Sequence, residues 1–294
     1  MQIDIAETTD QKQKIQAFFD RDQGWQGTIY DKPKDHYTRL MARRQLYNFQ
    51  MLDNLNICKS GIALDVGCGS GVYLEELSKR GCKAFGIDMS FQMLKASHEL
   101  LKNNNGDISI HLIAGDIEKI PLKSEQFDLV LCVGVLGYLL QDEKALLEIR
   151  RILKPNGVVL INVKNMLDLS NLDYVLRRKM RAMIFRRKDT RIKEMQPGVS
   201  MTSEWLVAHS PTHYRHKSYN LWKLERFMKN IGYRLVTART FGYDFRIIRR
   251  LKFLPELLLT TLEINMEKLF HKIRIPYFPY SGQVYIGIFQ KVCS

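Results

Sequence analysis

The sequence has few cysteines and no long apolar run. Its five cysteines, at positions 58, 68, 82, 132 and 293, form no Cys-x-x-Cys pair, which argues against a zinc site or a disulfide framework. No stretch approaches the roughly 18 consecutive apolar residues of a membrane span. The N-terminus, with Asp4, Glu7 and Asp10, lacks the basic start and apolar core of a signal peptide. We therefore expect a cytoplasmic protein with reduced thiols and no bound metal.

The charge is unevenly distributed along the 294 residues. Residues 1–149 hold 17 Lys and Arg against 21 Asp and Glu, whereas residues 150–294 hold 28 against 10. The second half, with a net charge of +18, favours an anionic partner such as nucleic acid, an anionic membrane surface or a phosphate-bearing substrate. The alternative is a set of solvated helix faces. The composition, 45% hydrophobic and 26% charged, is that of an ordinary globular protein.

A βαβ unit is predicted between Ile62 and Met89. An apolar run leads into the glycine turn at 67–71, a helical pattern follows, and a second apolar run ends on Asp88. An acid about 20 residues beyond such glycines is where a ribose-binding carboxylate is expected. A dinucleotide-binding turn needs a third small residue, and Val72 stands at that position. The pattern therefore favours a nucleoside ligand without a pyrophosphate.

The motif Asp65-x-Gly67-x-Gly69-x-Gly71 resembles the first motif of class I S-adenosylmethionine-dependent methyltransferases. Three further motifs agree with it in order: the acidic end of the second strand, Gly115-Asp116-Ile117 after a third, and the turn at 153–158. The resemblance is to small-molecule enzymes of the ubiquinone and menaquinone type. It implies S-adenosylmethionine as the cofactor, with these binding residues: Asp65, Gly67, Cys68, Gly69, Gly71, Asp88, Met89, Asp116, Ile117, Cys132 and Val133.

The resemblance also implies a fold. We expect an α/β, Rossmann-like sheet of seven mostly parallel strands in the order 3-2-1-4-5-7-6, with N-terminal helices and helical cap insertions. The predicted parts are an N-terminal helical lid at 1–57, a cofactor-binding core at 58–164, a basic helical cap insertion at 165–220, and the end of the core at 221–294. The last part carries a helical insertion at about 241–283.

The catalytic side chains are less clear from the sequence. Many relatives carry a histidine or an acid after the fourth strand, whereas this chain has Gly137 and Tyr138. Tyr138 is a candidate contact, and His213 or His216 is a candidate general base because the pKa of histidine lies near neutrality. The family resemblance makes the N-terminal segment a lid over the ligands. The candidate substrate contacts there are Trp25, Tyr30, Tyr37 and Arg43.

Two segments combine basic and apolar residues. Residues 172–193 hold nine Lys or Arg in an amphipathic helix pattern, and residues 246–272 begin with a basic cluster and continue with leucines. Such helices lie on anionic lipid, contact RNA, cover a greasy substrate or simply cross their own domain. The composition leaves these possibilities open, and the oligomeric state as well.

Together these features predict an S-adenosylmethionine-dependent methyltransferase that O-methylates a small or lipid-like acceptor, for example a prenylated or phosphate-bearing one. Two alternatives stay open. An RNA methyltransferase would use the basic half for phosphate contacts, although the sequence has no Asn-Pro-Pro-aromatic motif, no catalytic cysteine signature and no appended RNA-binding module. A non-catalytic, methyltransferase-like binding subunit is compatible with the unusual loop at Gly137 and Tyr138.

Overall fold

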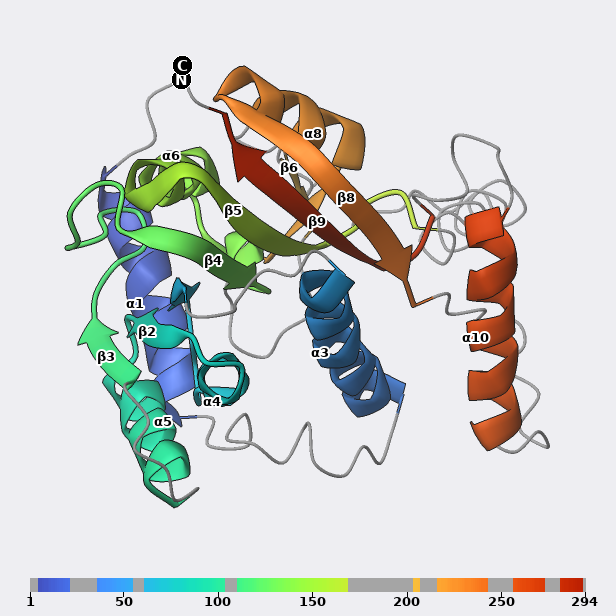
Figure 1. Ribbon diagram of the computed structural model, residues 1–294, viewed down its shortest axis with the longest axis horizontal. Helices are drawn as coiled ribbons and strands as arrows, with labels where there is room; N and C mark the ends of the chain where they lie inside the picture. Colours follow the sequence, from blue (N-terminus) through green and yellow to red (C-terminus); the bar gives the residue numbers. More distant parts are fainter. Residues whose placement is uncertain are drawn as a thin grey trace, which may run out of the picture.

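The protein is built around one seven-stranded β-sheet with helices on both faces (Figure 1). The computed structural model describes residues 5–21, 36–54, 61–103, 110–168, 203–206, 216–242, 256–272 and 281–292. The strands of the sheet are β1 (Ile62–Val66), β2 (Lys83–Asp88), β3 (Ile110–Ala114), β4 (Phe127–Val133), β5 (Leu153–Lys164), β8 (Tyr233–Phe241) and β9 (Val284–Lys291). The helices are α1 (Ile5–Arg21), α3 (His36–Asn54), α4 (Val72–Lys79), α5 (Phe91–Asn103), α6 (Asp142–Ile152), α8 (Leu221–Asn230) and α10 (Glu256–Lys272), with the 3-10 turn η2 (Leu136–Tyr138).

The strand order confirms the predicted topology. The sheet runs β3-β2-β1-β4-β5-β9-β8, which is 3-2-1-4-5-7-6 when its own strands are numbered along the chain. Neighbours from β3 to β5 pair in parallel, whereas β9 is antiparallel to both β5 and β8. The direction of winding reverses between β1 and β4. In sheets of this kind a ligand crevice forms outside the carboxyl ends of the strands at this reversal.

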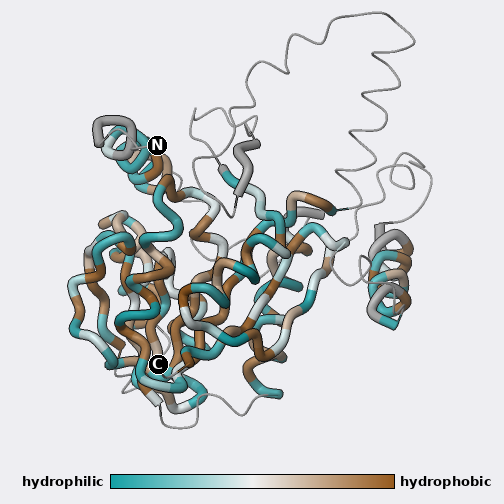
Figure 2. Tube along the Cα trace, turned by 90° about the horizontal axis from the view of Figure 1, so that it is seen from above, coloured by the Kyte–Doolittle hydropathy of each residue, from teal (hydrophilic) through white to brown (hydrophobic). Residues whose placement is uncertain are grey.

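Both faces of the sheet are buried. Helices α6 and α8 cover one face through side chains such as Ile149 and Leu224, and helices α3 and α4 cover the other through Leu52 and Leu74. Strands covered on both faces must be apolar along their whole length, as β4 and β5 are. Figure 2 shows the hydrophobic segments concentrated in these central strands.

A second, two-stranded sheet comes from the insertion between β5 and α8. Strands β6 (Ser203–Leu206) and β7 (His216–Tyr219) pair antiparallel. Tyr219 also bridges to Asn165 just beyond β5, and its carbonyl oxygen accepts a hydrogen bond from the Met166 N–H at 2.9 Å. The basic segments at 172–193 and 246–255 lie outside the described residues. Among the described helices, none combines the length and apolar character needed to cross a membrane.

Candidate functional site

A cavity of about 420 Å³ lies at the carboxyl ends of the central strands. Its walls come from the glycine loop after β1, the ends of β2, β4 and β5, the segment after β3, and the start of β9. Helices α1 and α3 close it from the other side. The cavity therefore occupies the crevice that the reversal of strand order creates.

The glycine loop brings the backbone close to the cavity. Gly67 and Gly71 have φ angles of +71° and +83°, which side-chain-bearing residues rarely adopt. A Cβ at Gly67 would lie 2.4 Å from a methyl group of Val135, and one at Gly71 would lie 2.2 Å from Ser97 Oγ. Space and conformation together require glycine at both positions. The loop thus exposes bare backbone to the cavity, as the close approach of a ligand demands.

Asp88 ties the loop to the end of β2. Its carboxylate accepts hydrogen bonds from the Gly69 N–H at 2.9 Å and the Ser90 N–H at 2.8 Å. Burial raises the pKa of Asp88, and the backbone hydrogen bonds oppose this shift. Met89 follows on the cavity wall, where its carbonyl oxygen accepts a hydrogen bond from Gln16 of α1 at 3.0 Å.

Asp65 is the most deeply buried acid of the cavity, with 1% of its surface exposed. Burial raises its pKa well above the ordinary value, the charge of Asp88 adds to this effect, and the positive charge of Arg44 opposes it. A buried carboxylate is stabilised when a cation is placed beside it. The pair Asp65 and Asp88 therefore suits a ligand that combines a positive charge with hydroxyl donors.

Asp116 and Ile117 line the cavity beyond β3. Asp116 accepts a hydrogen bond from the Glu118 N–H at 2.9 Å and forms an ion pair with Lys12 of α1. Ile117 is buried, with 6% of its surface exposed. An acid beside an apolar side chain fits a flat, nitrogen-rich ring that is stacked on one face and hydrogen-bonded at its edge.

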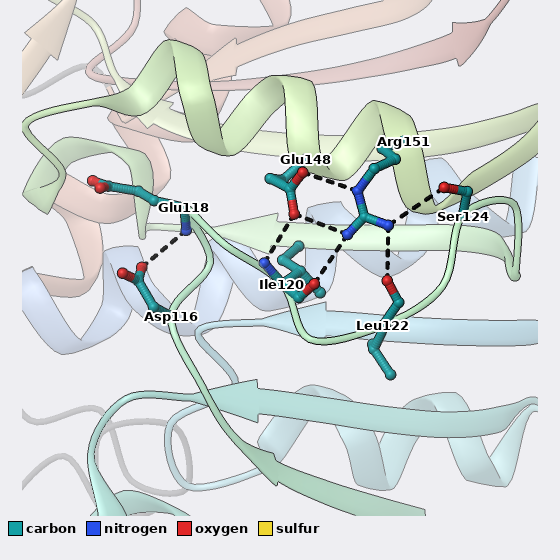
Figure 3. A network of polar contacts seen from close by, with 7 residues as sticks. All are labelled: Asp116, Glu118, Ile120, Leu122, Ser124, Glu148 and Arg151. Atoms are coloured by element: carbon teal, nitrogen blue, oxygen red, sulfur yellow. Dashed lines mark hydrogen bonds and ion pairs between the residues drawn. The ribbon is translucent and has the colours of Figure 1, made fainter.

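The segment that carries Asp116 is anchored to α6 (Figure 3). Arg151 donates to the carbonyl oxygens of Ile120 at 3.0 Å and Leu122 at 2.8 Å, and Glu148 accepts from the Ile120 N–H at 3.0 Å. Arg151 and Glu148 are themselves paired at 2.9 Å. This network gives the loop after β3 a fixed course, which holds Asp116 at the cavity.

Helix α1 covers the cavity by polar contacts. Lys12 binds both Asp116 and the buried Glu118; its burial opposes protonation, but these hydrogen bonds outweigh it and raise the pKa of Lys12. Gln11 donates to the Tyr138 carbonyl oxygen at 3.3 Å, and the rings of Phe19 and Tyr138 meet edge to face at 5.5 Å. Helix α1, which belongs to the segment 1–57, thus lies against the cavity.

A buried ion pair supports the loop after β4. Lys217 Nζ donates to Asp142 Oδ1 at 2.7 Å and to the Leu140 carbonyl oxygen at 2.9 Å, and both charged side chains are fully buried. The Tyr219 hydroxyl lies 2.8 Å from Asp142 Oδ2 and 2.9 Å from the Leu136 carbonyl oxygen. Strand β7 therefore fixes the loop that carries Tyr138, a cavity-lining residue.

Most of the predicted cofactor residues border the cavity. Those on its wall are Asp65, Gly67, Cys68, Gly69, Asp88, Met89, Asp116, Ile117 and Val133. Gly71 lies one turn further along as the residue before α4, and Cys132 is fully buried in β4 behind the wall. Burial raises the pKa of both cysteines, Cys68 and Cys132. Neither thiol is therefore set up as a nucleophile.

The predicted acceptor-side residues are more scattered. Trp25, Tyr30 and His213 lie outside the described residues, and the structure places Tyr37 in α3 and His216 at the start of β7 by their backbones alone. These assignments stay predictions.

Arg43 is not on the cavity wall. It binds Glu267 and lies 3.9 Å from Glu263, both on α10, and its guanidinium stands over the Tyr47 and Phe241 rings. Its predicted substrate contact is not visible in the described cavity.

Several cavity residues have no sequence signal of their own. Arg44 comes from α3, Asn162 and Lys164 from the end of β5, and Gln283 from the residue before β9. Arg44, the pair Asn162 and Lys164, and Gln283 are separated from one another by more than 100 positions along the chain and belong to no motif. The antiparallel pairing of β5 with β9, which sets Lys164 opposite Val284, brings the β5 pair and Gln283 together, and α3 adds Arg44.

The fold and the cavity together define a class of protein. It is a doubly wound α/β domain whose crevice holds a glycine loop, one acid at the end of each of β1 and β2, and a third acid just past β3. Residues 64–161 match the family model described as "Methyltransferase domain". Residues 64–161 thus carry a methyltransferase domain, within a fold of the class I S-adenosylmethionine-dependent type.

Relatives and solved structures agree with this assignment. A ubiquinone biosynthesis O-methyltransferase from Bradyrhizobium diazoefficiens is 30% identical over 127 residues, which are 41% of this chain and 49% of that protein. A demethylmenaquinone methyltransferase from Staphylococcus carnosus is 28% identical over 157 residues, 52% of this chain and 61% of that protein. Among solved structures, magnesium protoporphyrin IX methyltransferase from Synechocystis with bound SAH has the same fold. Its TM-score is 0.60 at 11% identity, over 96% of this chain and 99% of that one.

The sequence matches cover only part of those proteins. The chain spans about half the length of the curated relatives it matches. The acceptor side must therefore be argued from this chain's own residues.

Proposed function

We propose that this protein transfers the methyl group of S-adenosylmethionine to an oxygen atom of a small or lipid-like acceptor. The observation that carries the proposal is the row of acids at the cavity, Asp65, Asp88 and Asp116, which follows the strand order β1, β2, β3 beside a glycine loop. Each acid has a matching group on the cofactor.

The residues present fit this cofactor. Asp65 and the backbone of Gly67 and Gly69 would hold the methionine part of the cofactor. The ammonium group of that part would stabilise the ionised form of the buried Asp65 carboxylate. Asp88 would accept hydrogen bonds from the ribose hydroxyls, and Asp116 would accept one from the adenine amino group. Ile117 would pack on the adenine ring.

Little catalytic machinery is needed. When bound, the cofactor supplies a methyl group on a sulfonium, an excellent leaving group. The chain has to align the acceptor oxygen with that methyl group and exclude water. Helix α1 and the loop that carries Tyr138 are placed to do both, because they close the cavity over the strand ends.

The nature of the acceptor is supported by the cavity walls and by the relatives. The wall beside β4 and β9 includes Leu40, Met41, Val133 and Val284, which suits an apolar ring or chain. Two of the similar proteins are named demethylmenaquinone methyltransferase and ubiquinone biosynthesis O-methyltransferase. Another is named a protein arginine N-methyltransferase, so the family name alone does not decide between oxygen and nitrogen.

Calorimetric titration with S-adenosylhomocysteine tests the cofactor assignment. We expect the wild type to bind it, and Asp88→Ala to bind at least about tenfold more weakly, since the ribose hydroxyls lose an ionised acceptor worth about 1.5–3 kcal/mol. Lys79→Ala, an exposed residue on α4 paired only with its own helix, is the matched control. Absence of binding by the wild type would contradict the proposal, and unchanged affinity of Asp88→Ala would remove the ribose assignment.

A second proposal concerns α10, which stands beside α3 and the end of β8 (Figure 1). Its acidic face points inward: Glu267, with 1% of its side chain exposed, binds both Arg43 and Arg239, and Glu263 is also buried. An ordinary surface helix turns its apolar stripe inward. This helix is attached by ion pairs instead.

The opposite face of α10 is apolar and exposed. Leu258, Leu262 and Leu269 have 44%, 39% and 49% of their surfaces exposed, and at about 100° per residue they fall within one narrow stripe. Lys268 and Lys272 are exposed beside this stripe. Leucines flanked by lysines suit an anionic lipid surface, so we propose that α10 is a peripheral membrane contact that brings the cavity near lipid-like acceptors.

The RNA alternative makes different demands. It would require the basic second half of the chain to bind phosphates, with an affinity that falls steeply with salt. A salt-sensitive mobility shift with tRNA would favour it over the lipid contact.

A further inference from the structure

The charge of the polar groups around the cavity changes along the sheet. In the strand order β3, β2, β1 they include the acids Asp116, Asp88 and Asp65, whereas on the β4 and β5 side they are Arg44, Asn162, Lys164 and Gln283. The change falls at the reversal of strand order. A ligand that spans the cavity therefore meets three carboxylates at one end, one of them paired with Lys12, and two cations with two amides at the other.

Arg44 lies directly over the end of β4. A Cβ built on Gly134 would lie 2.8 Å from Arg44 Nη1 and 3.7 Å from Arg44 Cζ, so the guanidinium occupies the space that any side chain at Gly134 would need. Gly134 also has a φ angle of +72°, and its N–H donates to the Asn162 carbonyl oxygen at 3.2 Å. The guanidinium is thus held beside the strand end at which β4 and β5 meet.

Asn162 is a buried polar side chain with an unused donor. Only 2% of its surface is exposed, it borders the cavity, and its Nδ2 has no hydrogen-bond partner among the residues that the structure describes. Buried amide groups are normally paired, and an unpaired one is costly. Because the two ends of a carboxamide have nearly the same shape, rotation of the group presents the donor to the cavity. An acceptor atom on a ligand would then satisfy it.

We propose that Arg44 and Asn162 form the acceptor subsite, and that this subsite takes the oxyanion of an acidic hydroxyl group, a phenol or enol on an otherwise apolar ring. The inference rests on the proposed methyl transfer and names its substrate class. The apolar wall beside the two residues includes Val133 and Val284. Two strand steps, from β4 to β9, span roughly 10 Å, which is room for one ring.

The chemistry needs no histidine. Arg44 cannot accept a proton at neutral pH; its positive charge lowers the pKa of a nearby hydroxyl, whose proton then passes to water. An electron pair of the resulting oxyanion forms the new bond between oxygen and the methyl carbon. The bond between that carbon and sulfur breaks, and its electron pair stays on the sulfur. A protonated amine acceptor would be repelled by Arg44, so the subsite discriminates against amines.

The test uses 4-nitrophenol as the probe, because its phenolate is coloured and its ionisation can be followed without turnover. The probe is titrated with pH in the presence and absence of S-adenosylhomocysteine. For the wild type we expect the apparent pKa of the bound probe to fall by about one unit, a tenfold preference for the phenolate. Arg44→Gln should abolish this shift. Lys229→Gln, which removes an exposed cation on α8 outside the cavity, should leave it unchanged.

The variant Asn162→Leu distinguishes a role of the amide in ligand binding from a role in the stability of the fold. The substitution is close to isosteric and removes the unpaired donor. We therefore expect several-fold weaker binding of the phenolate without a loss of thermal stability. A structural role for the amide would instead lower the melting temperature.

The outcomes separate this inference from the one on which it rests. A wild type that binds no S-adenosylhomocysteine contradicts the methyltransferase proposal. A wild type that binds S-adenosylhomocysteine but not the phenolate overturns the subsite. The subsite is also overturned if Arg44→Gln and Asn162→Leu bind the phenolate as tightly as the wild type does. Tighter binding of 4-nitrobenzylamine, a cationic probe of similar size, would overturn the preference for an oxyanion.

Discussion

Replacement of Lys217 by methionine is the sharpest test of how the loop after β4 is held. Lys217 and Asp142 are both fully buried and lie 2.7 Å apart. Burial lowers the pKa of Lys217, and the attraction of Asp142 opposes this shift. Methionine keeps the length and volume of the side chain and removes only the charge and its hydrogen bonds. The variant therefore leaves the Asp142 carboxylate buried without its cation.

The cost follows from the burial of the pair. Removal of one partner of a buried ion pair costs about 3–5 kcal/mol, which for a chain of this size lowers the melting temperature on the order of 10 °C. Lys154→Met is the matched control, because Lys154 pairs with Asp128 at 2.8 Å while 37% and 44% of the two side chains are exposed. Such a surface pair contributes about 0–1 kcal/mol.

Denaturant unfolding of the two variants measures the difference. The double variant Lys217→Met with Asp142→Leu should recover part of the loss, because no charge is then left buried. Binding of S-adenosylhomocysteine should weaken with Lys217→Met, since the loop that carries Tyr138 loses its support. If Lys217→Met cost no more free energy than Lys154→Met, the interpretation of β7 as the anchor of this loop would be refuted.

Two further predictions concern the cavity and α10. Burial raises the pKa of Asp65 well above 3.8 in the folded protein. As the pH rises, the carboxyl group of Asp65 therefore ionises first in the unfolded chain, and the folded, ligand-free protein loses stability. Asp65→Asn should then melt at a higher temperature than the wild type by a margin that grows between acidic and neutral pH; a margin independent of pH would contradict this reasoning. For α10, replacement of Leu258, Leu262 and Leu269 by glutamine should lower flotation with phosphatidylserine vesicles several-fold. Absence of flotation by the wild type would count against the membrane contact.

Three polar groups of the cavity share one physical feature. The carboxylates of Asp65 and Asp88 and the amide of Asn162 are each buried at a cost to the free protein. They meet at one cavity, at the ends of strands whose other side chains are apolar. Buried polar groups that lack full hydrogen bonding or charge pairing are typical of a binding site when they gather at one place in a fold that is otherwise well packed. A ligand with complementary groups would recover that cost on binding.

The sheet and the cofactor side of the cavity could be predicted from the sequence. Buried parallel strands are continuous apolar runs, and β1, β2, β4 and β5 are visible as such. The glycine turn is equally local, because the positive φ angles of Gly67 and Gly71 favour glycine at both positions. Asp88 and Asp116 follow directly from strand ends. Contacts made within one βα unit leave a pattern in one stretch of sequence.

The acceptor side could not be predicted in the same way. Arg43 and Arg44 are adjacent in the sequence, yet one binds Glu267 of α10 and the other lies over Gly134 at the cavity. Which of the two faces the ligand depends on how α3 rotates on the sheet. The sequence alone favoured Arg43 for substrate contact, whereas the structure brings Arg44 to the cavity wall.

The sequence by itself determined the glycine loop and the strand ends that carry the three acids, because each depends on neighbours a few residues away, and the family resemblance supplied the order of the strands. Only the tertiary structure decided the positions of Arg44, Asn162 and Gln283, the burial of Lys217 against Asp142, and the outward leucines of α10. Those features arise where segments more than 70 residues apart come together. Their side chains carry no local pattern, since their partners are chosen by packing.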